Sequence, residues 1–145
     1  MKFIADDMLG KLAKRLRILG FDTAYPGSSA DSLLLRTSRE QDRIILTRDT
    51  GLVKVRGARA LLIHSKKLKE QLREVLQDLK LKITPEKMFS RCALCNGELK
   101  KVDKESIKDK VPPLVYDLFG DFTYCPHCDQ VYWKGTHYEK ILNEI

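Results

Sequence analysis

Residues 1–80 alternate between short apolar runs and longer segments in which apolar residues recur every three or four positions. Short apolar runs are typical of strands buried in a parallel sheet, whereas the longer spacing indicates amphipathic helices. We predict strands at residues 3–5, 21–25, 44–47 and 60–63. We predict helices over residues 8–19, from residue 31 onwards and over residues 65–79. The alternation of strand and helix indicates an α/β fold, with helices flanking a parallel sheet.

Polar residues and a glycine mark the predicted ends of these helices. Asp7, Asp31 and Ser65 stand where a side chain that caps a helix N-terminus is expected. Gly20 stands where the first helix is expected to end. Asp22, at the start of the second strand, is expected to pair with a basic neighbour.

The character of the chain changes after residue 82. We predict a linker at residues 83–90, in which Thr84–Pro85 can open a short helical turn. Residues 91–145 contain all 4 cysteines, short strand-like runs and a long excursion between the cysteine pairs. We therefore predict two units, residues 1–82 and residues 91–145.

The chain has 145 residues and an excess of basic ones, 27 Lys and Arg against 20 Asp and Glu. Residues 1–90 hold 19 basic and 11 acidic residues, a net charge of +8, whereas residues 91–145 hold 8 and 9. A basic surface favours a polyanionic partner, because binding phosphates releases condensed counterions. A solvated, lysine-rich surface is the alternative.

Several classes of protein are excluded by what the sequence lacks. No apolar run approaches the ~20 residues that a membrane span needs, and no Gly-rich phosphate loop is visible. We expect a soluble cytoplasmic protein that has neither a membrane nor a small molecule as its partner.

The 4 cysteines form two pairs, Cys92-x-x-Cys95 and Cys125-x-x-Cys128. Each pair can hold one face of a tetrahedral Zn²⁺, and four thiolates close such a site completely. Asn96 follows the first pair as a turn residue. The 29 residues between the pairs exceed the usual spacing of about 15–20, so an inserted excursion is required. Clustered cysteines without a secretion signal favour structural zinc over disulfides, and four unliganded thiols are the alternative.

Three aspartates stand where strands end or helices begin. Asp6 and Asp49 follow predicted strands, and Asp31 opens a predicted helix. In a parallel sheet such positions meet at the C-terminal edge of the strands. Three carboxylates there repel one another unless hard cations such as Mg²⁺ or Mn²⁺ lie between them, an arrangement that hydrolyses phosphodiesters. Taken singly, each aspartate is better explained as a helix cap or a turn residue.

Longer segments around these residues resemble known nucleases. The segment from Asp31 to Ser38 and the segment Ile44-Ile-Leu-Thr-Arg-Asp49 resemble the PIN-domain pattern, in which an aspartate opens a helix and Thr-x-Asp closes the following strand. Residues 8–20 (MLGKLAKRLRILG), the cysteine pairs and residues 131–138 (VYWKGTHY) resemble the Mut-seven C-terminal RNase domain family, a PIN-like fold fused to a zinc ribbon. The resemblance covers nearly the whole chain.

The resemblance implies that residues 1–82 form a PIN-like nuclease domain and residues 91–145 a zinc ribbon. It implies a divalent-metal-dependent ribonuclease that cleaves within RNA chains, with tRNA and rRNA as candidate substrates. One or two Mg²⁺ or Mn²⁺ ions would be held by Asp6, Asp31 and Asp49, with support from Thr47 and Arg48. The residues expected to contact RNA are Lys11, Lys14, Arg15, Arg48, Trp133 and His137. For Trp133, packing within the ribbon is the alternative, and for the whole protein it is a non-catalytic RNA- or ribonucleoprotein-binding module.

Overall fold

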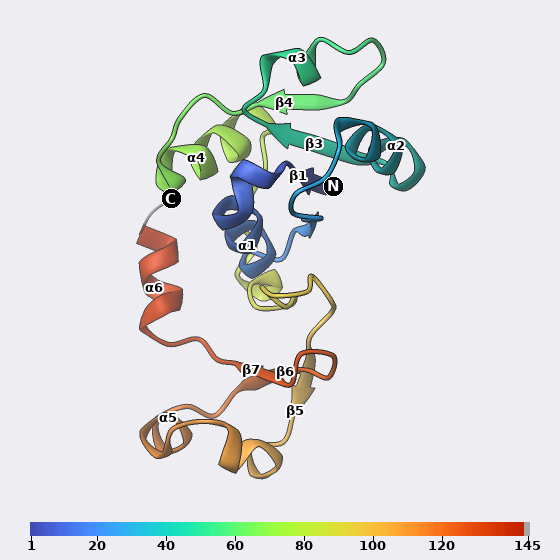
Figure 1. The fold of residues 1–145 in the computed structure, drawn as a ribbon. Helices are drawn as coiled ribbons and strands as arrows, with labels where there is room; N and C mark the ends of the chain where they lie inside the picture. Colours follow the sequence, from blue (N-terminus) through green and yellow to red (C-terminus); the bar gives the residue numbers. More distant parts are fainter. Residues whose placement is uncertain (144–145) are drawn as a thin grey trace.

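Four short parallel strands form a sheet in the order β2–β1–β3–β4 (Figure 1). The structure is a computed structural model and describes residues 1–143, except for the side chains of residues 136 and 137. The strands are β1 (Lys2–Ala5), β2 (Asp22–Ala24), β3 (Arg43–Thr47) and β4 (Ala60–Leu62). All three pairings between them are parallel, which confirms the predicted α/β fold and its four strands.

Helices cover both faces of this sheet. They are α1 (Gly10–Ile18), α2 (Asp31–Gln41), α3 (Thr50–Val53) and α4 (Leu68–Asp78). Because side chains alternate along a strand, Phe3 and Ala5 of β1 join the core beneath α1 and α4. Ile4 joins the smaller core beneath α2 and α3 on the opposite face. Every residue of β3 is buried, as a central strand covered on both faces requires.

The predicted N-terminal caps of the first two helices are wrong, because neighbouring residues occupy the cap positions. A 3-10 turn at Asp7–Leu9 precedes α1, and Asp6 caps it by accepting the backbone N–H of Asp7 at 2.8 Å. The cap of α2 is Ala30, so Asp31 is the first residue inside that helix. Both corrections leave the acidic side chains at the helix starts, where the helix dipole favours them.

The third predicted cap is also wrong, since α4 begins after a longer connection. Its N-cap is Lys67, which supplies no side-chain cap. Ser65 lies two residues earlier, and its Oγ accepts the backbone N–H of Lys67 at 3.1 Å. The serine therefore closes the turn that leads into the helix.

The second half of the chain forms a three-stranded antiparallel sheet, β5–β6–β7. Its strands are β5 (Lys100–Val102), β6 (Phe122–Cys125) and β7 (Gln130–Tyr132). Between the cysteine pairs lies the predicted excursion, which contains η3 (Lys104–Lys110) and α5 (Pro113–Leu118). A small core of Ile107, Val111, Phe122 and Val131 joins the excursion to the sheet.

The predicted linker packs against both sheets. It contains the short turn η2 (Pro85–Lys87) that Thr84–Pro85 indicates. Met88 and Phe89 follow and are buried in the main core. The last helix, α6 (Thr136–Asn143), places Ile141 in the same core. The division of the chain into units at residues 82 and 91 stays a prediction.

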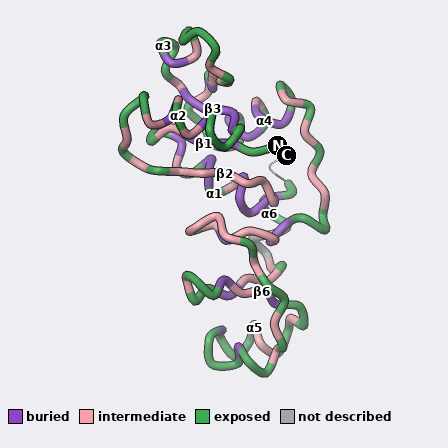
Figure 2. The backbone as a smooth tube through the Cα atoms, turned by 90° about the vertical axis from the view of Figure 1, so that its right-hand side faces the viewer, coloured by how far each residue is buried: buried purple, intermediate pink, exposed green. Residues whose placement is uncertain are grey.

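Buried positions gather in the four-stranded part of the molecule, whereas the excursion around α5 is mostly exposed (Figure 2). The described helices are each too short or too polar to cross a lipid bilayer.

Gly20 ends α1 as predicted. Its φ of +96° lies in the left-handed region, and an added Cβ would approach the backbone oxygen of Lys87 to 2.4 Å. We expect Gly20→Ala to lower the free energy of unfolding by about 2–4 kcal/mol, because backbone strain and a clash add together. Gly27 is the matched control: its φ is +78° but nothing lies within 4 Å of an added Cβ. Denaturant unfolding should show a loss of only about 1 kcal/mol for Gly27→Ala; equal losses would contradict the packing role.

Candidate functional site

Two aspartates follow the C-terminal ends of the central strands and are joined by one threonine. Thr47, the buried last residue of β3, donates from Oγ1 to Asp6 Oδ2 at 2.9 Å. The same hydroxyl oxygen accepts the backbone N–H of Asp49 at 3.0 Å. Because β1 and β3 are adjacent, Thr47 holds the two aspartates at one edge of the sheet.

Each of these carboxylates also accepts a backbone N–H from the turn that follows it. Asp6 Oδ1 accepts from Asp7 and Asp49 Oδ1 accepts from Gly51, both at 2.8 Å. Asp49 is therefore the N-cap of α3, a helix that we did not predict from the sequence. Its second oxygen, Oδ2, makes no hydrogen bond or ion pair with any described residue, which leaves it available to a ligand.

Asp31 lies at the start of α2, the helix that connects β2 to β3. A crossover helix runs antiparallel to the strands, so its first residue lies at the same end of the sheet as Asp6 and Asp49. The residue is exposed. Among residues 1–143, however, the three aspartates do not form a set whose oxygens are close enough to share a metal ion. The structure thus joins Asp6 and Asp49 through Thr47, whereas Asp31 makes no hydrogen bond or ion pair with either of them.

Four basic residues predicted to contact RNA lie on or near the acidic edge. Arg48 separates Thr47 from Asp49, is half-buried, and donates from Nη2 to the carbonyl oxygen of His64 at 3.3 Å. The exposed residues Lys11 and Lys14 and the half-buried Arg15 belong to α1, which begins just beyond Asp6.

Two further predicted RNA contacts belong to the second half of the chain. Trp133 is half-buried and packs edge-to-face on Phe122, with ring centroids 6.3 Å apart. Its surroundings are those of a residue that completes the small core. The side chain of His137 lies outside the described residues.

The four cysteines converge as predicted. The sulfur atoms of Cys92, Cys95, Cys125 and Cys128 all lie within 4.8 Å of one another. The sulfurs of Cys95 and Cys125 are 3.6 Å apart, close to the roughly 3.8 Å between two thiolates of a tetrahedral zinc with Zn–S bonds of about 2.3 Å. The geometry therefore fits a structural metal such as zinc with no position left open for a substrate.

The two cysteine pairs fold alike. The residue after each pair, Asn96 or Asp129, adopts a left-handed conformation, with φ of +71° and +53°. Backbone N–H groups point at the sulfurs, from Gly97 to Cys95 at 3.3 Å and from Cys128 to Cys125 at 3.4 Å. Asn and Asp tolerate this backbone conformation better than most residues, which accounts for their presence after the pairs.

The thiols have strongly divided acidities. Burial acts to raise the pKa of Cys92, but hydrogen bonds from Tyr132 and from backbone N–H groups outweigh it and bring the pKa to about 7. Burial and the neighbouring thiols raise the pKa of Cys128 to about 12. Sulfurs this close cannot all ionise without a cation between them, so the donor set suits a divalent metal that binds thiolates.

A buried arginine of helix α1 contacts the loop that carries the first cysteine pair. Arg17 of α1 is 6% exposed and donates from Nη1 to the carbonyl oxygens of Ala93 at 2.9 Å and Leu94 at 3.3 Å. Its Nε donates to the carbonyl oxygen of Thr23 at 2.8 Å. The guanidinium of Arg17 therefore binds both the loop of the first cysteine pair and the edge strand β2.

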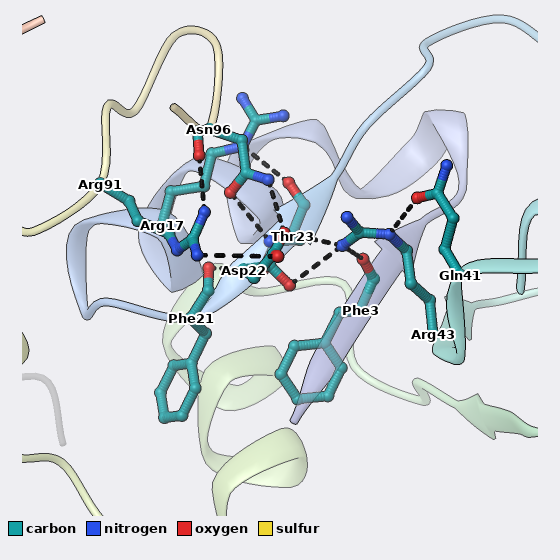
Figure 3. A network of polar contacts seen from close by, with 9 residues as sticks. All are labelled: Phe3, Arg17, Phe21, Asp22, Thr23, Gln41, Arg43, Arg91 and Asn96. Atoms are coloured by element: carbon teal, nitrogen blue, oxygen red, sulfur yellow. Dashed lines mark hydrogen bonds and ion pairs between the residues drawn. The ribbon is translucent and has the colours of Figure 1, made fainter. Parts of the chain in front are cut away.

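Asn96 makes further hydrogen bonds between the first cysteine loop and β2. We call this group of contacts, made by Arg17, Asp22 and Asn96, the polar joint. Its Nδ2 donates to Asp22 Oδ1 at 2.7 Å, and its Oδ1 accepts the backbone N–H of Thr23 at 2.9 Å (Figure 3). Asp22 also pairs with Arg43 at 2.8 Å and with Arg91 at 3.7 Å, which confirms the expected pairing with a basic neighbour. Burial acts to raise the pKa of Asp22, but these hydrogen bonds and charges hold it below its ordinary value.

The parallel sheet with its flanking helices, followed by a small sheet beside four clustered cysteines, defines a mixed α/β protein whose second part is consistent with a small zinc ribbon. The family model described as the Mut7-C RNAse domain matches residues 1–145, so the chain belongs to this family. The description of the family refers to an RNase domain.

A human protein, "Exonuclease mut-7 homolog", is 32% identical to this chain over 114 residues. The match covers 74% of this chain and 13% of the human protein. The chain therefore corresponds to a small part of that relative.

We expect the purified protein to contain one zinc ion per chain, because four converging thiolates form a closed site. Elemental analysis measures this directly, and Cys95→Ser should lose most of the metal. The prediction fails if the folded protein holds clearly less than one zinc and its thiols react freely.

Asn96→Gly tests the joint between the sheet and the cysteine loop. Glycine keeps the left-handed backbone conformation and removes only the side-chain amide, which bonds Asp22 and Thr23. We expect a loss of about 1–3 kcal/mol in the free energy of unfolding, the cost of leaving buried partners unsatisfied, with the zinc content unchanged. Unaltered stability in denaturant unfolding would contradict the role assigned to this amide.

Proposed function

We propose that this protein hydrolyses phosphodiester bonds of RNA with the help of Mg²⁺ or Mn²⁺, and that it acts in the cytoplasm. The observation that carries the proposal is the Asp6–Thr47–Asp49 arrangement at the C-terminal edge of adjacent parallel strands. In open α/β sheets this edge is where ligands bind. Membership of an RNase domain family supports the same conclusion.

The carboxylates fit a hard divalent cation, which takes oxygen ligands. Asp49 Oδ2 and the exposed carboxylate of Asp31 are free of hydrogen bonds within the described chain, and Asp6 is held in place by Thr47. Asp6, Asp31 and Asp49 would hold the ion, with Asp31 approaching from the start of α2. When bound, the metal supplies the Lewis acidity and the activated water that phosphodiester hydrolysis requires.

The chain's own cations would position the substrate. Arg48 lies between the threonine and the aspartate of the edge, where a guanidinium can bind a phosphate with two parallel hydrogen bonds. Lys11, Lys14 and Arg15 of α1 extend the basic surface beside it. Trp133 and His137 are proposed as further contacts on the ribbon.

We propose cleavage within the RNA chain, with tRNA or rRNA as the substrate. The name of the human relative, an exonuclease, offers the other mode. A circular single-stranded RNA separates the two, because only internal cleavage can open it.

The second candidate function is a non-catalytic module that binds RNA or a ribonucleoprotein. The observation that favours it is that, among the described residues, Asp6, Asp31 and Asp49 do not form a group close enough to share one metal ion. Protein that binds RNA but leaves it intact in Mg²⁺ and in Mn²⁺ would establish this function instead.

Asp49→Asn is the sharpest test of hydrolysis. Asparagine caps helices as well as aspartate, so α3 should persist while the charge that holds a hard cation is lost. We expect cleavage of single-stranded RNA in Mn²⁺ to fall by at least about 100-fold. RNA binding should persist or strengthen, because a carboxylate near the phosphates is removed.

The matched control is Asp103→Asn, which changes an exposed aspartate at the start of η3 in the ribbon. This variant should cleave at the wild-type rate. Equal activity of Asp49→Asn and wild type, with unaltered thermal unfolding, would exclude the proposed site.

A further inference from the structure

A cavity of about 320 Å³ lies at the opposite end of the sheet from Asp6 and Asp49. It is lined by the first residues of two strands, Lys2 of β1 and Asp22 of β2, and by residues from the segment 82–91. Its volume is at the lower end of the range of about 300–1,000 Å³ that is typical of ligand pockets. None of the residues proposed for hydrolysis lines it.

The lining of this cavity, which we call the basic pocket, carries an excess of positive charge. Four cations, Lys2, Lys82, Lys87 and Arg91, face one acid, Asp22. That acid already pairs with Arg43 and Arg91 and accepts a hydrogen bond from Asn96. The three lysines are exposed and form no ion pair with any described residue, so their charge is available to a ligand.

The backbone around one of these lysines, Lys87, is held in place by its neighbours. The backbone N–H of Phe89 donates to the carbonyl oxygen of Ile18 at 2.8 Å, and Phe89 is buried in the main core. The backbone of Lys87 lies directly against Gly20, so close that no side chain fits between them. A rigid backbone reduces the entropy that is lost when Lys87 binds an anion.

A second cavity extends the basic character of this end of the sheet. It has a volume of about 410 Å³ and is lined by Arg39, Arg56 and Arg59, together with Asp42, which pairs with Arg59. Arg59 directly precedes β4, so this cavity also adjoins the N-terminal ends of the strands. Cations thus outnumber carboxylates in both cavities at the N-terminal end of the sheet.

We propose that the basic pocket binds a backbone phosphate of an RNA strand at a distance from the bond that is cleaved. The proposal rests on RNA as the substrate in the proposed function. Asp6 follows Lys2 by four residues along β1, which separates pocket and acidic edge by about 13 Å at roughly 3.3 Å per residue. A dinucleotide therefore cannot reach both the basic pocket and the acidic edge, whereas a longer RNA strand can occupy both together.

The test is the double variant Lys82→Glu/Lys87→Glu. Binding of a fluorescent single-stranded RNA of twenty nucleotides is measured by anisotropy without added Mg²⁺ or Mn²⁺, at several salt concentrations. We expect Kd to rise by at least about tenfold, and the dependence of log Kd on log salt to become shallower, because fewer phosphates are neutralised. The milder pair Lys82→Gln/Lys87→Gln should give a smaller effect of the same sign.

The matched control is Lys69→Glu/Arg73→Glu, which changes the net charge equally on the exposed side of α4. These residues line neither cavity. An equal loss of affinity in this control would overturn the pocket and indicate a general effect of charge. Unchanged binding by the Lys82/Lys87 variants would overturn it as well.

Cleavage is measured separately, so failure of the two proposals can be told apart. If wild-type protein never cleaves RNA but the Lys82/Lys87 variants lose RNA binding, the proposal of the basic pocket is supported and the proposal of hydrolysis is rejected. If cleavage occurs, the charge-reversed variant should process a dinucleotide at the wild-type rate and show a raised KM for the longer RNA. Equal impairment on both substrates would contradict a site remote from the reaction.

Discussion

The arrangement of this molecule depends on one buried polar joint between the parallel sheet and the first cysteine loop. Arg17, Asp22, Arg91 and Asn96 make contacts that cross between the two parts (Figure 3). A buried charge is tolerated only when its hydrogen-bonding partners are in place, and those partners lie on opposite sides of the joint. These contacts therefore favour one position of the first cysteine loop against the sheet.

The same joint also satisfies backbone groups at the edge of the four-stranded sheet. β2 is an edge strand, and its outer backbone groups would be free to pair with another chain. The side-chain amide of Asn96 takes the N–H of Thr23, and Arg17 takes its carbonyl oxygen. Side chains from the ribbon and from α1 thus cover this part of the edge without adding a strand.

Sequence patterns predicted the elements that depend on local periodicity and on fixed spacing. The four strands, the long helices and the cysteine ligands belong to this group, because alternation, helical repeats and paired thiols are visible within a few residues. The helix caps were wrong by one or two positions, since Asp6 and Asp7 are equally good caps by chemistry. Which of the two aspartates caps the turn depends on where β1 ends. The four-residue helix α3 is too short to carry a periodic signal.

The candidate site was predictable in part for the same reason. Strand ends placed Asp6 and Asp49 at one edge, but the hydroxyl that links them depends on the pairing of β1 with β3. The joint itself was not predicted, because its members are distant in the sequence. One signal was present: Arg17 stands four residues after Ala13, on the face of α1 that is otherwise apolar.

The return of α6 to the main core has a consequence for the topology of the ribbon. Phe89, just before the ribbon, and Ile141, near its end, are anchored in one core, so the ribbon is a closed loop of about 50 residues. Closing a loop removes conformations from its unfolded ensemble, and the entropic cost of closure grows only slowly with loop length. The main core therefore restricts the two ends of the ribbon as a covalent cross-link would. It also holds α6, the last helix, in the same cluster of buried residues as α1, the first.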